Sequence, residues 1–138
     1  MKSITTYLNF NGNCGEAMKF YNRCLGGELH MMPFSEVPGG NFPPEAKDRV
    51  MHAAIIKNGG AIVMASDTMP GSPFQQGNNF AICVAPETSE ETDRLFGAFS
   101  EGGKVTMPLQ DTFWGARFGQ LTDRFGVNWM FNYEKPKQ

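Results

Sequence analysis

The sequence lacks any long apolar run and any cluster of basic residues. A membrane-spanning helix needs about 20 consecutive apolar residues, and no stretch of this chain approaches that length. The 12 Lys and Arg residues are scattered singly, and the formal net charge is -2. Nucleic-acid binders instead concentrate basic charge on one surface. We therefore expect a protein that spans no membrane and binds no nucleic acid.

Histidine and paired cysteines are also scarce. His30 and His52 are the only two histidines, too few for a three-histidine zinc site. The three cysteines form no C-x-x-C pair, so we expect no disulfide framework. Three buried, reduced thiols are expected, because free Cys is among the most often buried residue types. The N-terminal segment lacks the features of a secretory signal, and the simplest expectation is a cytoplasmic location.

The first half of the chain predicts a strand, a helix and three strands. Residues 4–10 alternate between apolar and polar positions, as a half-buried strand does. Asn13 and Glu16 form a predicted capping pair before a helical stripe that ends at Gly26 and Gly27. The three strands that follow are predicted at residues 28–34, 49–56 and 61–66, with a turn at 58–60.

The second half repeats this order. A strand is predicted at residues 79–84, and Thr88 with Glu91 caps a helix that ends at Gly102. Aligning Gly26 with Gly102 gives an offset of 76 residues (102 minus 26). The last three strands are predicted at 104–109, 112–122 and 127–134. We expect one α+β domain, residues 1–138, with module one at about 1–67 and module two at about 78–138.

This double βαβββ order resembles the PhnB-like branch of the vicinal oxygen chelate superfamily, which includes glyoxalase I, bleomycin-resistance proteins and extradiol dioxygenases. The segments YLNFNGNCGEAMKFY and FWGARFGQLTDRFGVNWMFNYE carry the likeness, which covers nearly the whole chain. It implies two curved mixed sheets that enclose a cavity, with helices on the outer face, often in a homodimer. It also implies a small-molecule-binding protein, or an enzyme of lyase, isomerase or dioxygenase type, with a small organic ligand. The alternatives are a non-catalytic sequestering protein or a dimeric interaction module.

The resemblance also implies four metal-ligand positions, on the first and last strands of each module. They fall on Thr5 or Tyr7, Met64, Asn79 and Met130. None of these is a good ligand for zinc, iron or nickel, which prefer imidazole and carboxylate donors. A site of one His with a carboxylate from Asp67, Asp123 or Glu134 stays open. A divalent metal is therefore possible but unsupported, and the cofactor is unknown.

Three residues are candidates for catalysis: His52, Asp67 and Glu134. His52 stands beside two alanines in a predicted strand, where an imidazole could face a cavity. The alternative is a core or interface imidazole held by one hydrogen bond. Pairing of the strands about the turn at 58–60 leaves two possibilities for His52 and Asp67, which could lie close together or on opposite faces.

The aromatic run at residues 111–134 is predicted to divide by parity. If Thr122 lies opposite Val127 across the turn at 123–126, most of the aromatics share a core face. The other face, with Arg117, Met130, Asn132 and Glu134, is then expected to carry the site, with Phe113 and Trp114 at its rim. Together with the cavity positions above, the predicted ligand-binding residues are Tyr7, Asn79, Phe113, Trp114, Arg117, Met130 and Asn132.

Some relatives in this branch carry a name that implies methylation of a ubiquinone precursor. A methyltransferase of the common type binds its nucleoside cofactor at a glycine-rich turn between a strand and a helix. Here the glycine pairs at 26–27 and 102–103 follow predicted helices instead. Methyl transfer is therefore not favoured.

Overall fold

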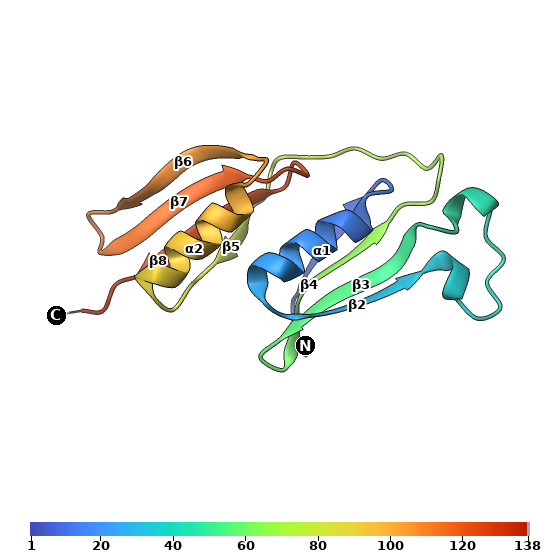
Figure 1. The fold of residues 1–138 in the computed structure, drawn as a ribbon, viewed down its shortest axis with the longest axis horizontal. Coiled ribbons are helices and arrows are strands. Elements are labelled where there is room, and N and C mark those ends of the chain that lie inside the picture. The colour runs from blue at the N-terminus through green and yellow to red at the C-terminus, as the bar shows by residue number, and fades with distance from the viewer. Residues whose placement is uncertain (138) are drawn as a thin grey trace. The chain divides into compact units, whose positions relative to one another are not determined.

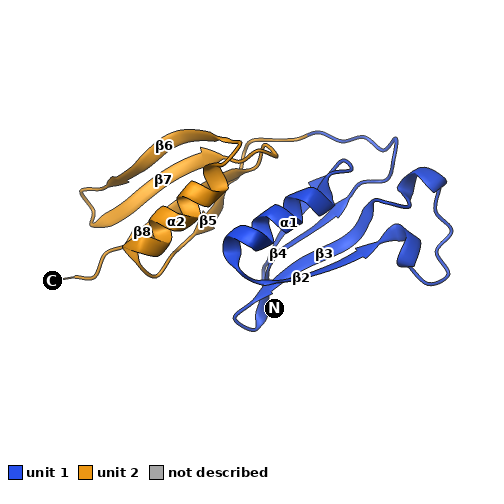
Figure 2. Cartoon of the chain, in the orientation of Figure 1, with its two compact units in different colours: residues 1–75 blue, residues 76–138 orange. Residues whose placement is uncertain are grey.

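The computed structural model describes residues 1–137, which form two βαβββ modules (Figure 1). Module one comprises residues 1–75, and module two begins at residue 76 (Figure 2). Each module holds one four-stranded mixed sheet and one α-helix. The predicted α+β fold of two repeated modules is thus confirmed. In the described part of the chain, no helix combines the length and the apolar character that membrane crossing requires.

Module one has the sheet order β1-β4-β3-β2, in which only the β1–β4 pair is parallel. Two short 3-10 helices, Phe34–Glu36 and Pro44–Ala46, interrupt the loop between β2 and β3. The other elements are β1 (Thr6–Phe10), α1 (Cys14–Leu25), β2 (Glu28–Pro33), β3 (Val50–Lys57) and β4 (Gly60–Asp67).

Helix α1 lies across one face of this sheet (Figure 1). Leu8 and Phe10 of β1 are buried on that face, as their alternation predicts. The helix ends at Gly26, whose φ of +76° is a left-handed conformation that glycine adopts at little cost. The predicted capping by Asn13 is wrong, because its side chain makes no capping hydrogen bond. The backbone N–H at the start of the helix, that of Cys14, instead donates a hydrogen bond to Asp67 of β4.

Module two repeats the arrangement with the order β5-β8-β7-β6 and a parallel β5–β8 pair. Thr88 Oγ1 accepts a hydrogen bond from the Glu91 N–H at 3.0 Å, so this predicted capping pair is confirmed. The elements are β5 (Ile82–Val84), α2 (Ser89–Ser100), β6 (Lys104–Asp111), β7 (Ala116–Thr122) and β8 (Asn128–Glu134).

The core of module two is a cluster of rings between α2 and β8. Phe99 stands 4.4 Å from Trp129, centroid to centroid, and Phe96 stands 5.5 Å from Phe131. Gly119 of β7 leaves room for this packing, because a Cβ there would come within 2.8 Å of the Phe96 ring. These rings therefore form the hydrophobic core, as predicted for most of the aromatic residues at 111–134.

Two strands are shorter than the sequence predicts, and one thiol is more exposed. Of the predicted strand 79–84, only Ile82–Val84 forms a β-strand, so Asn79 lies outside it. The predicted strand 112–122 begins at Ala116, so residues 113–115 form a turn. Cys14 and Cys24 are buried as expected, but Cys83 is exposed. Its strand is a short edge strand, and Cys83 pairs in register with Met130, which lies on the face away from α2.

Candidate functional site

The face of the module-one sheet opposite α1, here called the helix-free face of module one, carries both His52 and Tyr7. Successive side chains of a strand point to opposite faces, so burial of Leu8 against the helix places Tyr7 on the other side. In the same way, Ala53 and Ile55 are fully buried under α1 and His52 faces away. The sequence therefore brings two polar rings to one face from two strands that are not direct neighbours.

Tyr7 and His52 touch. Tyr7 Oη lies 3.2 Å from His52 Nδ1, within hydrogen-bond distance, and the ring centroids are 5.8 Å apart with an interplanar angle of 30°. Tyr7 is 43% exposed, so the pair is accessible from the helix-free face. The sequence indicated each residue separately but could not show their contact. Their predicted roles, catalysis for His52 and ligand binding for Tyr7, stay predictions.

Asp67 lies on the other face, under α1, and is only 5% exposed. Its Oδ1 accepts hydrogen bonds from the backbone N–H groups of Gly12 and Cys14, at 2.8 and 3.0 Å, and its Oδ2 accepts from Val50 N–H at 2.9 Å. Both carboxylate oxygens are thus engaged in holding β1, α1 and β3 together. Of the two possibilities for His52 and Asp67, the structure shows the opposite faces of the sheet. Asp67 has a structural role there, and its predicted part in catalysis stays a prediction.

Cys14, at the start of α1, shares this environment. Burial, and secondly the charge of Asp67, raise the pKa of its thiol to about 12. A thiol with so high a pKa stays protonated near neutral pH and is a poor nucleophile. Cys14 is therefore a structural core residue.

Asp123 of module two is also a buried carboxylate with both oxygens hydrogen-bonded. Its Oδ1 accepts from the N–H groups of Phe125 and Val127, at 2.7 and 3.0 Å, and its Oδ2 accepts from the indole Nε1 of Trp129 at 2.8 Å. It is 3% exposed. The sequence suggested Asp123 only as a possible metal ligand, and its oxygens are instead occupied in closing the turn between β7 and β8.

The pairing of β7 with β8 differs by one residue from the prediction. Thr122 lies opposite Asn128, not Val127. This slip moves Arg117 to the α2 side, where its Nε and Nη2 each lie 2.9 Å from Asp93 Oδ1 of that helix. The predicted grouping of Arg117 with three residues of β8 is therefore wrong. The face away from α2 carries those three residues of β8, which are Met130, Asn132 and Glu134, together with Phe118 and Gln120 of β7.

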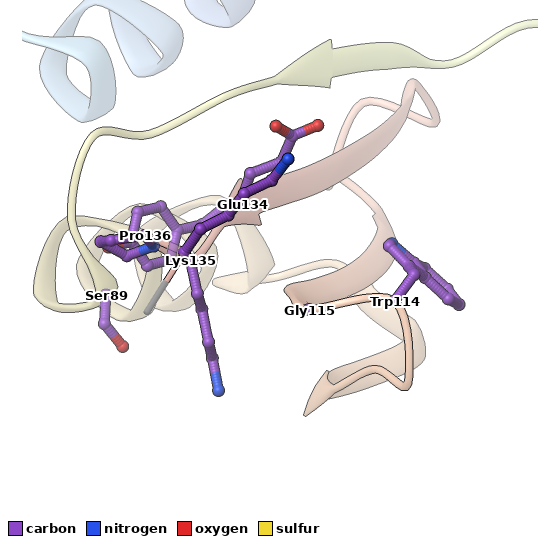
Figure 3. Close-up of a pocket in the computed structure, with 8 residues that line it drawn as sticks. Ser89, Trp114, Gly115, Glu134, Lys135 and Pro136 are labelled. Atoms are coloured by element: carbon purple, nitrogen blue, oxygen red, sulfur yellow. The ribbon is translucent and has the colours of Figure 1, made fainter.

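Phe113 and Trp114 lie in the turn before β7 and are 97% and 58% exposed. Trp114 also lines a pocket of about 710 Å³ in module two. Glu134 is a second predicted residue in that pocket (Figure 3). The lining residues are Ser89, Trp114, Gly115, Tyr133, Glu134, Lys135, Pro136 and Lys137. Asn79 is exposed and precedes β5, so its predicted ligand contact stays a prediction.

The metal-ligand positions implied by the fold do not suit a divalent ion. Met64 of β4 and Met130 of β8 present thioethers, and Thr5 and Asn79 precede the first strand of each module. Within residues 1–137, no group of three or more His, Cys, Asp or Glu side chains is placed to hold a metal ion. The donors present therefore do not fit the metal chemistry of the superfamily.

Known proteins share both the sequence and the fold of this chain. Protein YjdN of Escherichia coli strain K12 is 35% identical over 96% of this chain and 95% of its own length. The crystal structure of protein PA1353 from Pseudomonas aeruginosa is 44% identical, covers 99% of this chain and 100% of that one, and has a TM-score of 0.88. The PhnB protein from Bacillus cereus is 30% identical over 96% of this chain and 99% of that one, with a TM-score of 0.76.

A more distant structure shares the fold alone. It is a glyoxalase/bleomycin resistance protein/dioxygenase family enzyme from Burkholderia phytofirmans PsJN, 14% identical over 94% of this chain and 98% of that one, with a TM-score of 0.63. A family model described as 3-demethylubiquinone-9 3-methyltransferase matches residues 2–131. The chain therefore belongs to the PhnB-like family that this model describes, and it shares the glyoxalase-like fold.

Proposed function

We propose that the protein binds a small organic molecule, as a binding protein or enzyme of the glyoxalase and bleomycin-resistance type, and that Tyr7 and His52 contact the ligand. The observation that carries this proposal is the 3.2 Å contact between the two side chains on the helix-free face of module one. Family membership supports the glyoxalase-like type. Ligand sites commonly combine apolar walls with a few polar groups that converge.

The pair can offer a hydrogen-bond donor to a ligand in either of its two arrangements. A neutral imidazole carries one donor nitrogen and one acceptor nitrogen. If Tyr7 Oη–H donates to His52 Nδ1, the remaining Nε2–H is a donor. If Nδ1–H donates to Tyr7 Oη, the phenol O–H is a donor. The ligand would therefore present an acceptor such as a carbonyl, hydroxyl or carboxylate oxygen. The same pair could transfer a proton as a general acid or base.

The cross-strand register partners of the pair are apolar. Met64 is the register partner of Tyr7, and Met32 is the register partner of His52. Met32 and Ile62 remain 40% and 37% exposed. Thioethers and an aliphatic side chain favour an apolar or aromatic ligand body. We accordingly expect a mainly apolar molecule with at least one oxygen acceptor.

Thermal-shift screening against aromatic and amphiphilic metabolites tests this function. A true ligand should raise the melting temperature of the wild type. Tyr7→Phe and His52→Gln should each reduce that rise. His30→Gln should not, because the His30 side chain is 62% exposed and its imidazole lies 3.4 Å from Glu28 instead of in the Tyr7–His52 contact. Silence across a broad library, or equal shifts in all variants, would contradict the proposal.

A metal-dependent form of the function needs a separate test. Elemental analysis with native mass spectrometry measures the bound metal and the oligomer together. A stoichiometric divalent ion, or a large thermal stabilisation by added zinc, nickel, manganese or iron, would show that side chains other than the two methionines bind a metal. We expect neither result, because Met64 and Met130 are weak donors for such ions.

A second candidate function is a homodimeric interaction module, with or without sequestration of a ligand. Phe113 favours this candidate, because its apolar side chain is 97% exposed at a turn and would be buried by contact with a second subunit. Native mass spectrometry of Phe113→Ser should then show loss of a dimer that the wild type forms. An unchanged oligomer would remove this candidate. A cytoplasmic location is proposed with either function, and cell fractionation checks it.

Methyl transfer is not part of the proposed function. The family description names it, but Gly26 and Gly102 both follow helices in the structure. A nucleoside-binding turn of the common methyltransferase type would instead run from a strand into a helix. Isothermal titration with S-adenosylmethionine should show no binding.

A further inference from the structure

The pocket of module two is built by three segments that the proposed Tyr7–His52 site does not use. Ser89 is the first residue of α2, Trp114 and Gly115 belong to the turn before β7, and the rest of the wall is the chain from 133 to 137. The volume of about 710 Å³ falls among ligand pockets, which span roughly 300–1,000 Å³. It therefore admits a small organic molecule.

Backbone and side-chain contacts tie the two longer walls together. Lys135 N–H donates to Gly115 O at 3.0 Å, and Lys135 Nζ lies 2.9 Å from Asp111 Oδ1. Thr112 N–H donates to Ala116 O at 2.8 Å and closes the turn between them. The walls are thus positioned by the fold itself, which lowers the ordering cost of binding.

The pocket has an aromatic surface. The ring of Trp114 is held between Phe113 and Phe118, with centroid distances of 5.1 and 6.3 Å, yet the residue remains 58% exposed. Tyr133 and Pro136 add to the opposite wall. An exposed indole whose orientation is set by neighbouring rings is a suitable stacking surface for a planar molecule.

The charges of the lining favour an anion. The lining contains two lysines, Lys135 and Lys137, and one acidic residue, Glu134. Figure 3 shows the Lys135 side chain extending away from the Glu134 carboxylate, so that this carboxylate does not neutralise it. Asp111 occupies part of the donor capacity of Lys135, and an ammonium group has three N–H donors in all. The Ser89 hydroxyl adds a neutral donor.

We propose that this pocket is a second ligand site, selective for a small planar aromatic carboxylate. The aromatic ring stacks on Trp114, and the carboxylate accepts hydrogen bonds from Lys135 and Lys137. The inference goes beyond the proposed function, because the Tyr7–His52 pair takes no part in it.

Intrinsic fluorescence measures binding at this site directly. The chain has two tryptophans, and because Trp129 is only 1% exposed, a ligand in the pocket acts on Trp114. Titration with sodium benzoate should give a saturable change in emission. Benzamide, which has the same shape without the charge, should bind at least tenfold more weakly, and benzylamine more weakly still. Equal affinities for benzoate and benzamide, or no saturable change with benzoate, would overturn the proposal.

Variants separate this site from the one in module one. By calorimetry, Lys135→Met and Lys137→Met should each raise the Kd for benzoate several-fold, whereas Lys135→Arg should largely retain binding. Lys104→Met is the matched control, because Lys104 is exposed on β6 and does not line the pocket. Benzoate affinity unchanged in both lysine variants, or lost in His52→Gln, would contradict the assignment to this pocket.

Discussion

The backbone N–H of Cys14 donates a hydrogen bond of 3.0 Å to Oδ1 of Asp67. The first residue of α1 is therefore capped by the last residue of β4, which is 53 positions away in the chain. A helix start leaves several N–H groups without intrahelical partners, and a carboxylate there also suits the positive end of the helix dipole. The contact joins helix and sheet at the point where β1 leads into α1.

Asp67→Asn should lower the free energy of unfolding by about 2–3 kcal/mol, because one carboxylate oxygen that accepts backbone N–H bonds becomes an amide donor. Urea unfolding followed by circular dichroism measures the loss. Asp48→Asn is the matched control, since Asp48 is exposed, and it should unfold within about 0.5 kcal/mol of the wild type. A neutral effect at position 67 would contradict the structural role.

Asp123→Asn should destabilise the turn between β7 and β8 by a similar mechanism, about 2–3 kcal/mol. The substitution disturbs the bonds to Val127 N–H and to the Trp129 indole. The emission of buried Trp129 should change in the folded variant, and unfolding should occur at lower urea concentration. A variant as stable as the wild type would show that these bonds contribute little.

The thiols should differ in reactivity. Iodoacetamide at pH 8 should label exposed Cys83 and leave Cys14 unmodified in the folded protein, as read by mass spectrometry. Burial raises the pKa of Cys14 from 9.0 to about 12. The unfolded thiol therefore loses its proton at a lower pH than the folded one, and stability should fall as the pH rises from about 9 towards 12. In Cys14→Ala this part of the pH dependence should disappear.

Two glycines of module two should respond oppositely to alanine. In Gly119→Ala the new Cβ would lie 2.8 Å from the Phe96 ring and 3.0 Å from Leu109, so a loss of about 1–3 kcal/mol is expected. Gly97 lies inside α2 with open space around it. Gly97→Ala should therefore stabilise the protein by about 0.5–1 kcal/mol. Thermal unfolding of both variants checks the signs, and stabilisation by Gly119→Ala would refute the packing described here.

The carboxyl group of Asp111 should titrate at unusually low pH. Its hydrogen bond to Lys135, with smaller effects of Arg117, lowers the pKa. Carbon NMR of the side chain should show this, and Lys135→Met should move the pKa back towards its ordinary value. Since the folded pKa is the lower one, the contribution of the pair to stability is present above the ordinary Asp pKa and is lost as the pH falls through the folded value. A titration unchanged by Lys135→Met would exclude the pairing.

The order of elements could be predicted because its signals are local. Alternation places Leu8 and Phe10 inward, and glycines end both helices within a residue or two of the predicted positions. Thr88 and Glu91 cap α2 as predicted, since both belong to the same turn of chain. Such patterns involve residues only a few positions apart, where sequence spacing and spatial distance are closely related.

The register of β7 and β8 could not be predicted, because it depends on the conformation of one turn. Asp123 N–H donates to Val127 O at 2.8 Å, and Gly126 adopts a φ of +84°. These features define a three-residue loop that includes Gly126 in the left-handed conformation. Each residue of β7 therefore pairs one position further along β8 than predicted. Arg117 thereby changes face, which no count of alternating residues reveals.

The sequence by itself determined the two modules, the family resemblance and the weakness of the metal donors, because residue types and local periodicities suffice for these. Only the tertiary structure decided which side chains meet. It joined Tyr7 to His52 and separated His52 from Asp67 by placing them on opposite faces of one sheet. It also brought Lys135 to the turn that carries Trp114. Contacts of this kind arise from strand pairing over tens of residues, where a shift of a single position exchanges the two faces.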